Sequence, residues 1–257
     1  MKNLHRLSAV AALLVPLGGA VVLGAGPASA ATTGCLPNTA LPVNSFSATY
    51  ITQNTFESGT FKPASPPAPS SYPAFIPTAQ GTGTATVSKT LKLTGACSAY
   101  LHVTNDSGSL ANLALPLPSS TAGYYADGWF DITKAGVSGN DVPYFRFFSG
   151  SNRIADIYRY NSNGQLWLRV TAPSGSFVYS KLVAGNISLS VWHHIQMHII
   201  PKGNATTIEV WYDGKLVYSS KTVSTAATSL STVQLGAEHY RQMGDSYIDN
   251  VIIQKGK

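Results

Sequence analysis

Short runs in which hydrophobic and polar residues alternate follow one another from residue 82 to the end of the chain. The runs are rich in β-branched and aromatic residues, and clusters of Gly, Asn, Asp, Ser or Pro separate them. A period of two predicts strands that turn one face towards a core. The predicted strands are Thr84–Leu93, Ser98–Thr104, Gly128–Ile132, Tyr144–Phe148, Ile154–Tyr160, Gln165–Val170, Phe177–Ser180, Val191–Ile200, Thr207–Tyr212, Leu216–Ser219, Thr232–Leu235 and Tyr247–Gln254.

Two tight turns connect neighbouring strands in this pattern. One is Asn161-Ser162-Asn163-Gly164, and the other is Asp213-Gly214, where a type I′ turn needs the positive φ angles that these residue types tolerate. No stretch keeps a helical period over three turns. The pattern therefore predicts an all-β, two-sheet antiparallel sandwich.

The first thirty residues have the pattern of a secretory signal peptide. Lys2, His5 and Arg6 precede the apolar run Leu7–Gly24, and Ala28-Ser29-Ala30 offers the small residues that signal peptidase accepts. We expect cleavage after Ala30 and export by a bacterial type of signal. No later segment has the ~20 apolar residues needed to cross a bilayer, so no membrane span is predicted.

Residues 31–257 are expected to form one domain, with an N-terminal segment and a Pro-rich surface loop at residues 62–80. The chain has two cysteines, Cys35 and Cys97. Because an exported protein reaches an oxidising compartment, we predict that they form a disulfide. Such a bond would join the N-terminal segment to the domain across the Pro-rich loop.

The charge of the chain argues against binding to nucleic acids. The net charge of +6 falls to +4 when Lys2 and Arg6 leave with the signal peptide, and no run of consecutive Lys or Arg occurs. Nucleic-acid-binding proteins usually gather positive charge in a patch or stripe. The mild basicity instead suggests a polar surface with weak attraction to acidic polymers.

Four strings of residues resemble one fold family in their order and spacing. They are Trp192-His193-His194-Ile195, Val210–Leu216 with its Asp-Gly turn, Val233–Gly236 and Tyr247–Val251. Together they resemble the laminin G-like jelly-roll domains of the concanavalin A-like lectin and glucanase superfamily. The resemblance implies two curved antiparallel sheets, one face of which commonly holds sugar, peptide or lipid. This fold hosts lectins, glycanases, lyases and adhesion modules, so it does not by itself define a function.

Strand alternation places aromatic and polar residues together on outward faces. Flat rings pack on the C–H faces of sugars, and guanidinium groups bind hydroxyl, uronate or sulfate groups. The alternative is that the same rings cover the sheet or pack under loops. The candidate ligand-binding residues are Trp167, Arg169, Arg146, Tyr144, Tyr158, Trp211 and His198.

A metal site is considered at two places. His194 and His198 face the same side of one strand but stand about 13 Å apart, which is too far to share one ion. Asp249 lies within the last strand, where comparable jelly rolls often bind a structural Ca²⁺ through hard oxygen ligands. The alternative for Asp249 is a hydrogen bond to the backbone of a neighbouring loop.

The residues offer little support for catalysis. Only Glu57, Glu209 and Glu238 follow the signal peptide, and no pair of acids has the strand spacing that glycoside hydrolysis requires. The prediction is a secreted, non-catalytic, lectin-like protein that binds a polysaccharide or glycan. One alternative is a polysaccharide lyase or glycoside hydrolase of the same fold. The other is a structural or adhesion protein of the cell envelope, and the sequence predicts no oligomeric state.

Overall fold

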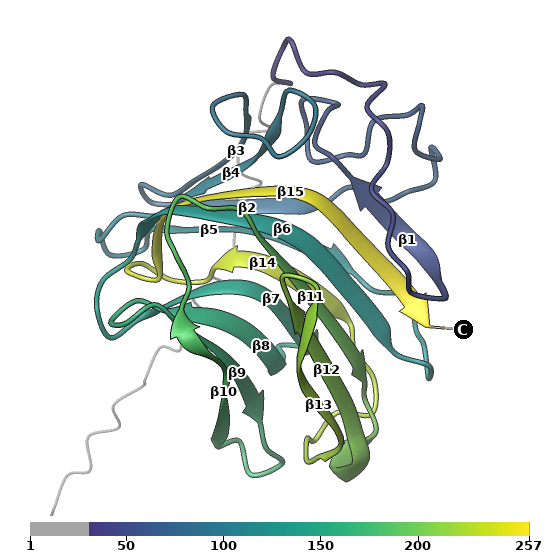
Figure 1. The fold of residues 1–257 in the computed structure, drawn as a ribbon, viewed down its shortest axis with the longest axis vertical. Helices are drawn as coiled ribbons and strands as arrows, with labels where there is room; N and C mark the ends of the chain where they lie inside the picture. Colours follow the sequence, from purple (N-terminus) through teal and green to yellow (C-terminus); the bar gives the residue numbers. More distant parts are fainter. Residues whose placement is uncertain (1–30, 257) are drawn as a thin grey trace, which may run out of the picture.

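The computed structural model describes residues 31–256 as two antiparallel sheets that pack face to face in curved layers (Figure 1). One sheet has the order β13-β12-β11-β6-β15-β4-β3, with β1 also paired to β15, and the other has the order β10-β9-β8-β7-β14-β5-β2. The strands are β1 (Ala48–Asn54), β2 (Ile76–Gln80), β3 (Thr84–Ser88), β4 (Ser98–His102), β5 (Leu110–Pro116), β6 (Tyr124–Ala135), β7 (Asp141–Ser149), β8 (Asn152–Tyr160), β9 (Gln165–Thr171), β10 (Phe177–Asn186), β11 (His193–Ile200), β12 (Thr206–Tyr212), β13 (Lys215–Val223), β14 (Thr232–Ala237) and β15 (Met243–Gly256).

The predicted all-β sandwich is confirmed, and each predicted strand is present with shifted ends. The sequence pattern missed β1, β2 and β5. Strand β2 lies inside residues 62–80, which the sequence predicts to be a Pro-rich loop. A proline such as Pro77 argues against a strand, because it has no N–H group to donate. Strand β2 forms at the edge of its sheet and pairs with β5 alone, where a missing N–H is tolerated. The single short helix, η1 (Gly203–Ala205), is a 3₁₀ turn, and no helix within residues 31–256 is long and apolar enough to cross a membrane.

The core lies between the two sheets and contains large aromatic and aliphatic side chains from both. The ring of Phe130 on β6 meets the rings of Tyr144 and Phe145 on β7 edge-on, each at 5.1 Å between centroids. Both β7 residues are buried because the register of β7 against β8 shifts between Pro143 and Arg146. This bulge breaks the alternation predicted for the strand, so Tyr144 lies in the interior, 1% exposed.

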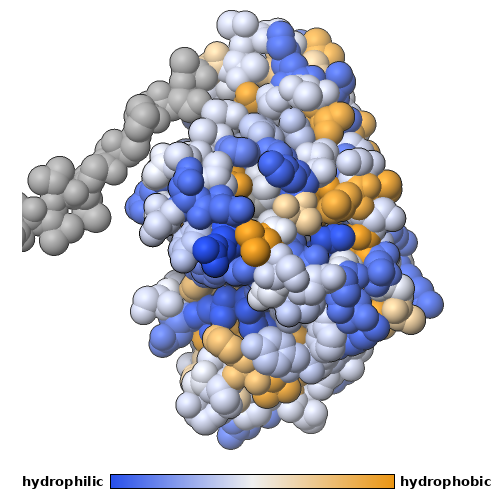
Figure 2. All heavy atoms as spheres, turned by 90° about the vertical axis from the view of Figure 1, so that its left-hand side faces the viewer, coloured by the Kyte–Doolittle hydropathy of each residue, from blue (hydrophilic) through white to orange (hydrophobic). Residues whose placement is uncertain are grey.

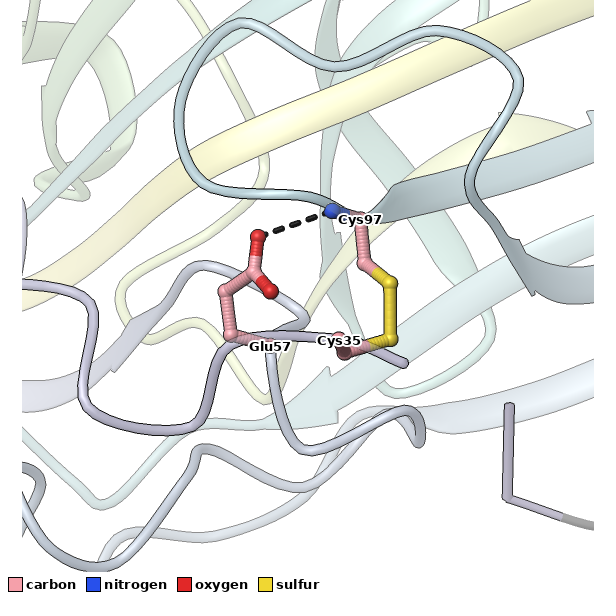
Figure 3. Close-up of side chains that lie close together, drawn as sticks. All are labelled: Cys35, Glu57 and Cys97. Atoms are coloured by element: carbon pink, nitrogen blue, oxygen red, sulfur yellow. Dashed lines mark hydrogen bonds between the residues drawn. A yellow bond between two sulfur atoms is a disulfide. The ribbon is translucent and has the colours of Figure 1, made fainter. Parts of the chain in front are cut away.

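The predicted disulfide between Cys35 and Cys97 is present and ties the N-terminal segment to the start of β4 (Figure 3). Beside it lies the wholly buried carboxylate of Glu57. Its Oε1 accepts the N–H groups of Ala96 and Cys97 at 2.6 and 2.8 Å, and its Oε2 accepts that of Leu36 at 2.5 Å. The three side chains approach within 4.8 Å, but sulfur atoms in a disulfide are not thiolates, so the group does not fit a metal site.

A second buried carboxylate holds the same loop from its other end. Oδ2 of Asp249 accepts the N–H groups of Leu93 and Thr94 at 2.9 and 3.1 Å, and Oδ1 accepts that of Asn250 at 2.7 Å. Three backbone N–H groups thereby find acceptors in the interior. The loop that enters β4 is therefore fixed between Glu57 and Asp249.

Candidate functional site

A row of polar side chains crosses the outer face of the sheet that contains β7 to β10. The strand registers place Gln234 beside Arg146, Arg146 beside Asp156, Asp156 beside Arg169, and Arg169 beside Tyr179. Directly paired residues point to the same face of a sheet. The row therefore spans β14, β7, β8, β9 and β10 with alternating arginine and aspartate at its centre.

Arg169 is the centre of this row. Its Nε and Nη2 donate to the two oxygens of Asp156 at 2.9 and 2.5 Å, and its Nη1 lies 2.8 Å from Oδ2 of Asp141. Burial lowers the pKa of Arg169, but the hydrogen bonds and charges of Asp156 and Asp141 outweigh it and hold the pKa above its ordinary value. Burial alone would raise the pKa of Asp141, yet the charges of Arg169 and Arg146 hold it below its usual range. Both partners are thus charged at neutral pH.

Arg146 lies under the loop that joins β14 to β15 and has no exposed surface. Its Nη1 donates to Oε1 of Gln234 at 2.9 Å and lies 3.1 Å from Oε2 of Glu238, and its Nη2 donates to Oε1 of Gln242 at 3.3 Å. Gln242 in turn donates through Nε2 to Asp141 at 2.5 Å. Arg146 is therefore a member of the row that the loop covers, and it does not reach solvent.

An open cleft of about 500 Å³ adjoins the row. Tyr158 and Trp167 are paired across β8 and β9 on its floor, and the guanidinium of Arg169 lies 4.8 Å from the centre of the Tyr158 ring. Tyr179 on β10 is half exposed at the rim, beside Phe177. The residues that line the cleft are Gly139, Asn140, Asp141, Tyr158, Tyr160, Asn163, Trp167, Arg169 and Tyr179.

The edge of this sheet formed by β9 and β10 lies on the left of Figure 1. Figure 2 shows that side of the molecule, where small hydrophobic patches lie between hydrophilic residues. On β10, Phe177 and Tyr179 are 45% and 50% exposed. Such a mixture of rings and polar groups suits a ligand with both apolar and hydroxylated faces.

The structure brings three of the predicted ligand-binding residues into the cleft, namely Trp167, Arg169 and Tyr158. Arg146 belongs to the same row but is covered, and Tyr144 lies in the core. Both stand on β7, one residue on each side of Phe145 at the bulge. The sequence pattern could not place the bulge, because that depends on the pairing with β8.

Trp211 and His198 lie on the other sheet. His198 stacks on Tyr125 at 4.0 Å between ring centres, and its Nδ1 lies 2.9 Å from Oε2 of Glu209. Burial lowers the pKa of His198 against the opposing effect of Glu209. Phe46 of the N-terminal segment packs 5.1 Å from Trp211 and 4.5 Å from Tyr125. This face is thus separate from the cleft and partly covered by the protein's own chain.

The sequence pattern missed several residues of the cleft and its support, namely Asp141, Gln234, Gln242 and Tyr179. Tyr179 follows Phe177 by two positions on a predicted strand, and this alternation was a usable signal. The other three had no local signal, because their partners come from strands far away in the sequence.

Asp249 is surrounded by hydrogen-bond donors. Both of its carboxylate oxygens accept backbone N–H groups, so the arrangement matches the alternative of a hydrogen bond to a loop. Calcium favours several oxygen ligands, and N–H groups aimed at the same oxygens do not fit such a site. Calcium at Asp249 stays a prediction from the resemblance.

The same carboxylate predicts a pH dependence of stability. Burial raises the pKa of Asp249 to about 7 against its three N–H bonds, and the charge of Glu57 adds to the rise. In the unfolded chain the pKa is about 3.9. The unfolded chain thus loses this proton first, so the free energy of unfolding falls as the pH rises from about 4 to about 7, by at most about 4 kcal/mol.

Urea unfolding at several pH values tests this expectation. Asp249→Asn removes the titration, so the variant should show a flatter pH dependence between about pH 4 and about pH 7. The exposed Asp106 gives a control, because Asp106→Asn should keep the slope of the unaltered protein. Equal slopes for all three proteins would show that Asp249 does not titrate in this range.

Comparisons with known proteins find structures with a similar fold but no sequence family that matches. No sequence family matches the chain, and no curated protein sequence matches it. The structure is similar to the endo-β-1,4-glucuronan lyase of the fungus Trichoderma reesei, with a TM-score of 0.58, 14% identity, and 70% of this chain and 90% of that chain covered. It is also similar to a cellulose induced protein, Cip1, with a TM-score of 0.59, 14% identity, and 79% and 96% covered.

A third similar structure is domain 4 of an extracellular arabinanase from Geobacillus stearothermophilus in complex with arabinotriose. Its TM-score is 0.53 at 16% identity, with 81% of this chain and 93% of that chain covered. Identities this low establish the shared two-sheet architecture alone. Membership of the concanavalin A-like superfamily therefore stays a prediction.

Proposed function

We propose that the protein binds a carbohydrate in the cleft over β8, β9 and β10 and that it acts without catalysis. The observation that carries the proposal is the joint placement of Tyr158, Trp167 and Tyr179 with Arg169 in one open cleft. Aromatic rings offer flat surfaces to the C–H faces of a sugar, while Asn140, Asn163 and the free N–H groups of Arg169 offer partners for hydroxyls. The three similar structures support carbohydrate as the ligand class, because their names refer to glucuronan, cellulose and arabinan.

The cleft offers weak support for a lyase or a hydrolase. Asp141 is the carboxylate among its lining residues, and it is held by Arg169 and Gln242. A lyase needs a base, but burial raises the pKa of Tyr158 above its ordinary value, which makes its phenolate harder to form. These features favour binding over turnover. Measuring retention and product formation on the same polysaccharides tests both.

We further propose that the protein is secreted. The expected signal peptide, residues 1–30, lies outside the described residues, so this proposal rests on the sequence pattern and on the disulfide. Disulfides persist in oxidising compartments outside the cytosol.

Trp167→Ala is expected to weaken binding to a retained polysaccharide at least about tenfold, which corresponds to about 1.4 kcal/mol. The ring contributes contact area that alanine cannot replace. Affinity electrophoresis against a panel of neutral and uronic polysaccharides measures the change, and reducing-end and ultraviolet assays detect products. Trp211→Ala on the other sheet is the matched control and should bind as the unaltered protein does.

Three results would count against the proposal. Equal affinity of the Trp167→Ala and unaltered proteins would place the ligand elsewhere on the molecule. New reducing ends or unsaturated uronate products would identify an enzyme, and absence of binding across the whole panel would favour a structural or adhesion role.

A further inference from the structure

The charges beneath and around the cleft cancel one another. Each arginine of the network lies within 4 Å of a carboxylate, as in the contacts of Arg153 with Asp156 at 3.7 Å and of Arg146 with Asp156 at 3.9 Å. The network contains three cations and three anions, which are Arg146, Arg153, Arg169, Asp141, Asp156 and Glu238. It therefore gives the cleft almost no net charge of its own.

Most of the donor groups of Arg169 are already engaged by carboxylates of the protein. A guanidinium binds a carboxylate most strongly through two parallel N–H groups. On Arg169 the pair formed by Nε and Nη2 is already used by Asp156, and Nη1 faces Asp141. Of its five N–H groups, one on Nη1 and one on Nη2 remain for a ligand.

Asp141 stands in the cleft itself, as one of its lining residues. A uronate or sulfate group placed against Arg169 would come close to this carboxylate. Like charges in contact are unfavourable, and the burial of Asp141 reduces the screening by water and salt. Asp141 thus cancels the attraction that Arg169 would otherwise offer to an anion.

We propose that Asp141 determines specificity by making the cleft selective for an uncharged glycan over one that carries uronate or sulfate groups. This inference rests on the proposed function, namely that the cleft binds carbohydrate. Lys181 on β10 is paired with Trp167 on β9 and is an exposed cation beside the cleft. Its charge is surrounded by solvent, which limits its attraction for an anion.

Matched ligands separate the effect of charge from that of linkage. Each uronic polysaccharide, such as glucuronan, alginate or pectate, is compared with its carboxyl-reduced form, in which every acid has become a primary alcohol. The unaltered protein is expected to bind at least one reduced form about tenfold or more tightly than its parent acid. In Asp141→Asn the ratio of the affinity for the reduced form to the affinity for the acid should shrink several-fold, because the acid binds more tightly. This gain in affinity for the acid should disappear at high salt.

Asp106→Asn is the control for total charge, because it makes the same change on an exposed loop away from the cleft. It should leave the ratio of the two affinities unchanged. Melting curves confirm that both variants fold, and if Asp141→Asn does not fold, the ratio for the unaltered protein decides the matter.

The possible failures are distinguishable. Tighter binding of the acids by the unaltered protein, or an unchanged ratio in folded Asp141→Asn, would overturn the inference and leave carbohydrate binding in place. No binding to any member of the panel would overturn the proposed function and the inference together.

Discussion

Replacing Asp156 with alanine is expected to lower the free energy of unfolding by about 3–5 kcal/mol. Asp156 is completely buried, binds Arg169 through both oxygens and lies within 4 Å of Arg146 and Arg153. Its removal leaves guanidinium groups in the sheet without their shared counter-ion. Urea unfolding followed by circular dichroism measures the loss as a shift of the midpoint.

Two further variants separate the ion pairs from the general effect of truncation. Asp106→Ala removes an exposed aspartate and should change stability by less than about 0.5 kcal/mol. The double variant Asp156→Ala/Arg169→Met should lose less stability than the sum of the two single losses, because the contact between Asp156 and Arg169 can be lost only once. A loss under about 1 kcal/mol in Asp156→Ala would contradict the expectation.

Glu57→Ala is expected to cost about 3 kcal/mol or more. It leaves the backbone N–H groups of Leu36, Ala96 and Cys97 without their acceptor, and each unmade buried bond costs about 1–3 kcal/mol. These residues adjoin both halves of the disulfide, so the covalent link would remain while the contacts around it are lost (Figure 3). Thermal melting under oxidising conditions measures the effect.

Glu57→Gln is the matched variant, because it keeps the length of the side chain and one acceptor oxygen. Its loss should fall between those of the unaltered protein and of Glu57→Ala. If Glu57→Ala melts within a degree or two of the unaltered protein, the three N–H groups must find other partners, and the carboxylate does not hold the segment.

The sequence predicted the sandwich because alternation is a local property that each strand displays by itself. The grouping of Tyr158, Trp167 and Arg169 has the same local origin, since they alternate on two strands joined by the Asn161–Gly164 turn and β8 pairs with β9. Their role in binding a ligand stays a prediction. The assignment of strands to sheets is not local. For that reason Trp211 and His198, which show the same alternation, were grouped with residues of the opposite sheet.

Pairing between segments that are far apart in the sequence explains the remaining differences between the prediction and the structure. The bulge that turns Tyr144 inwards exists only in the pairing of β7 with β8. Asp141 becomes a partner of Arg169 only once β7, β8 and β9 lie side by side, and Gln242 reaches Asp141 from a loop 101 residues away along the chain. A single aspartate or glutamine carries no pattern that would reveal such a contact.

The position of the cleft on an outermost strand has a consequence for solubility. Within residues 31–256, β10 pairs with β9 alone, so one side of its backbone is open beside the exposed residues Phe177, Val178 and Tyr179. An open edge with apolar side chains is a template on which a second chain can add, and a lysine in such a strand opposes that addition. Lys181 is placed in this way on β10. The exposed rings proposed to contact a ligand and a lysine that would oppose the addition of a second chain therefore lie on the same ten-residue strand.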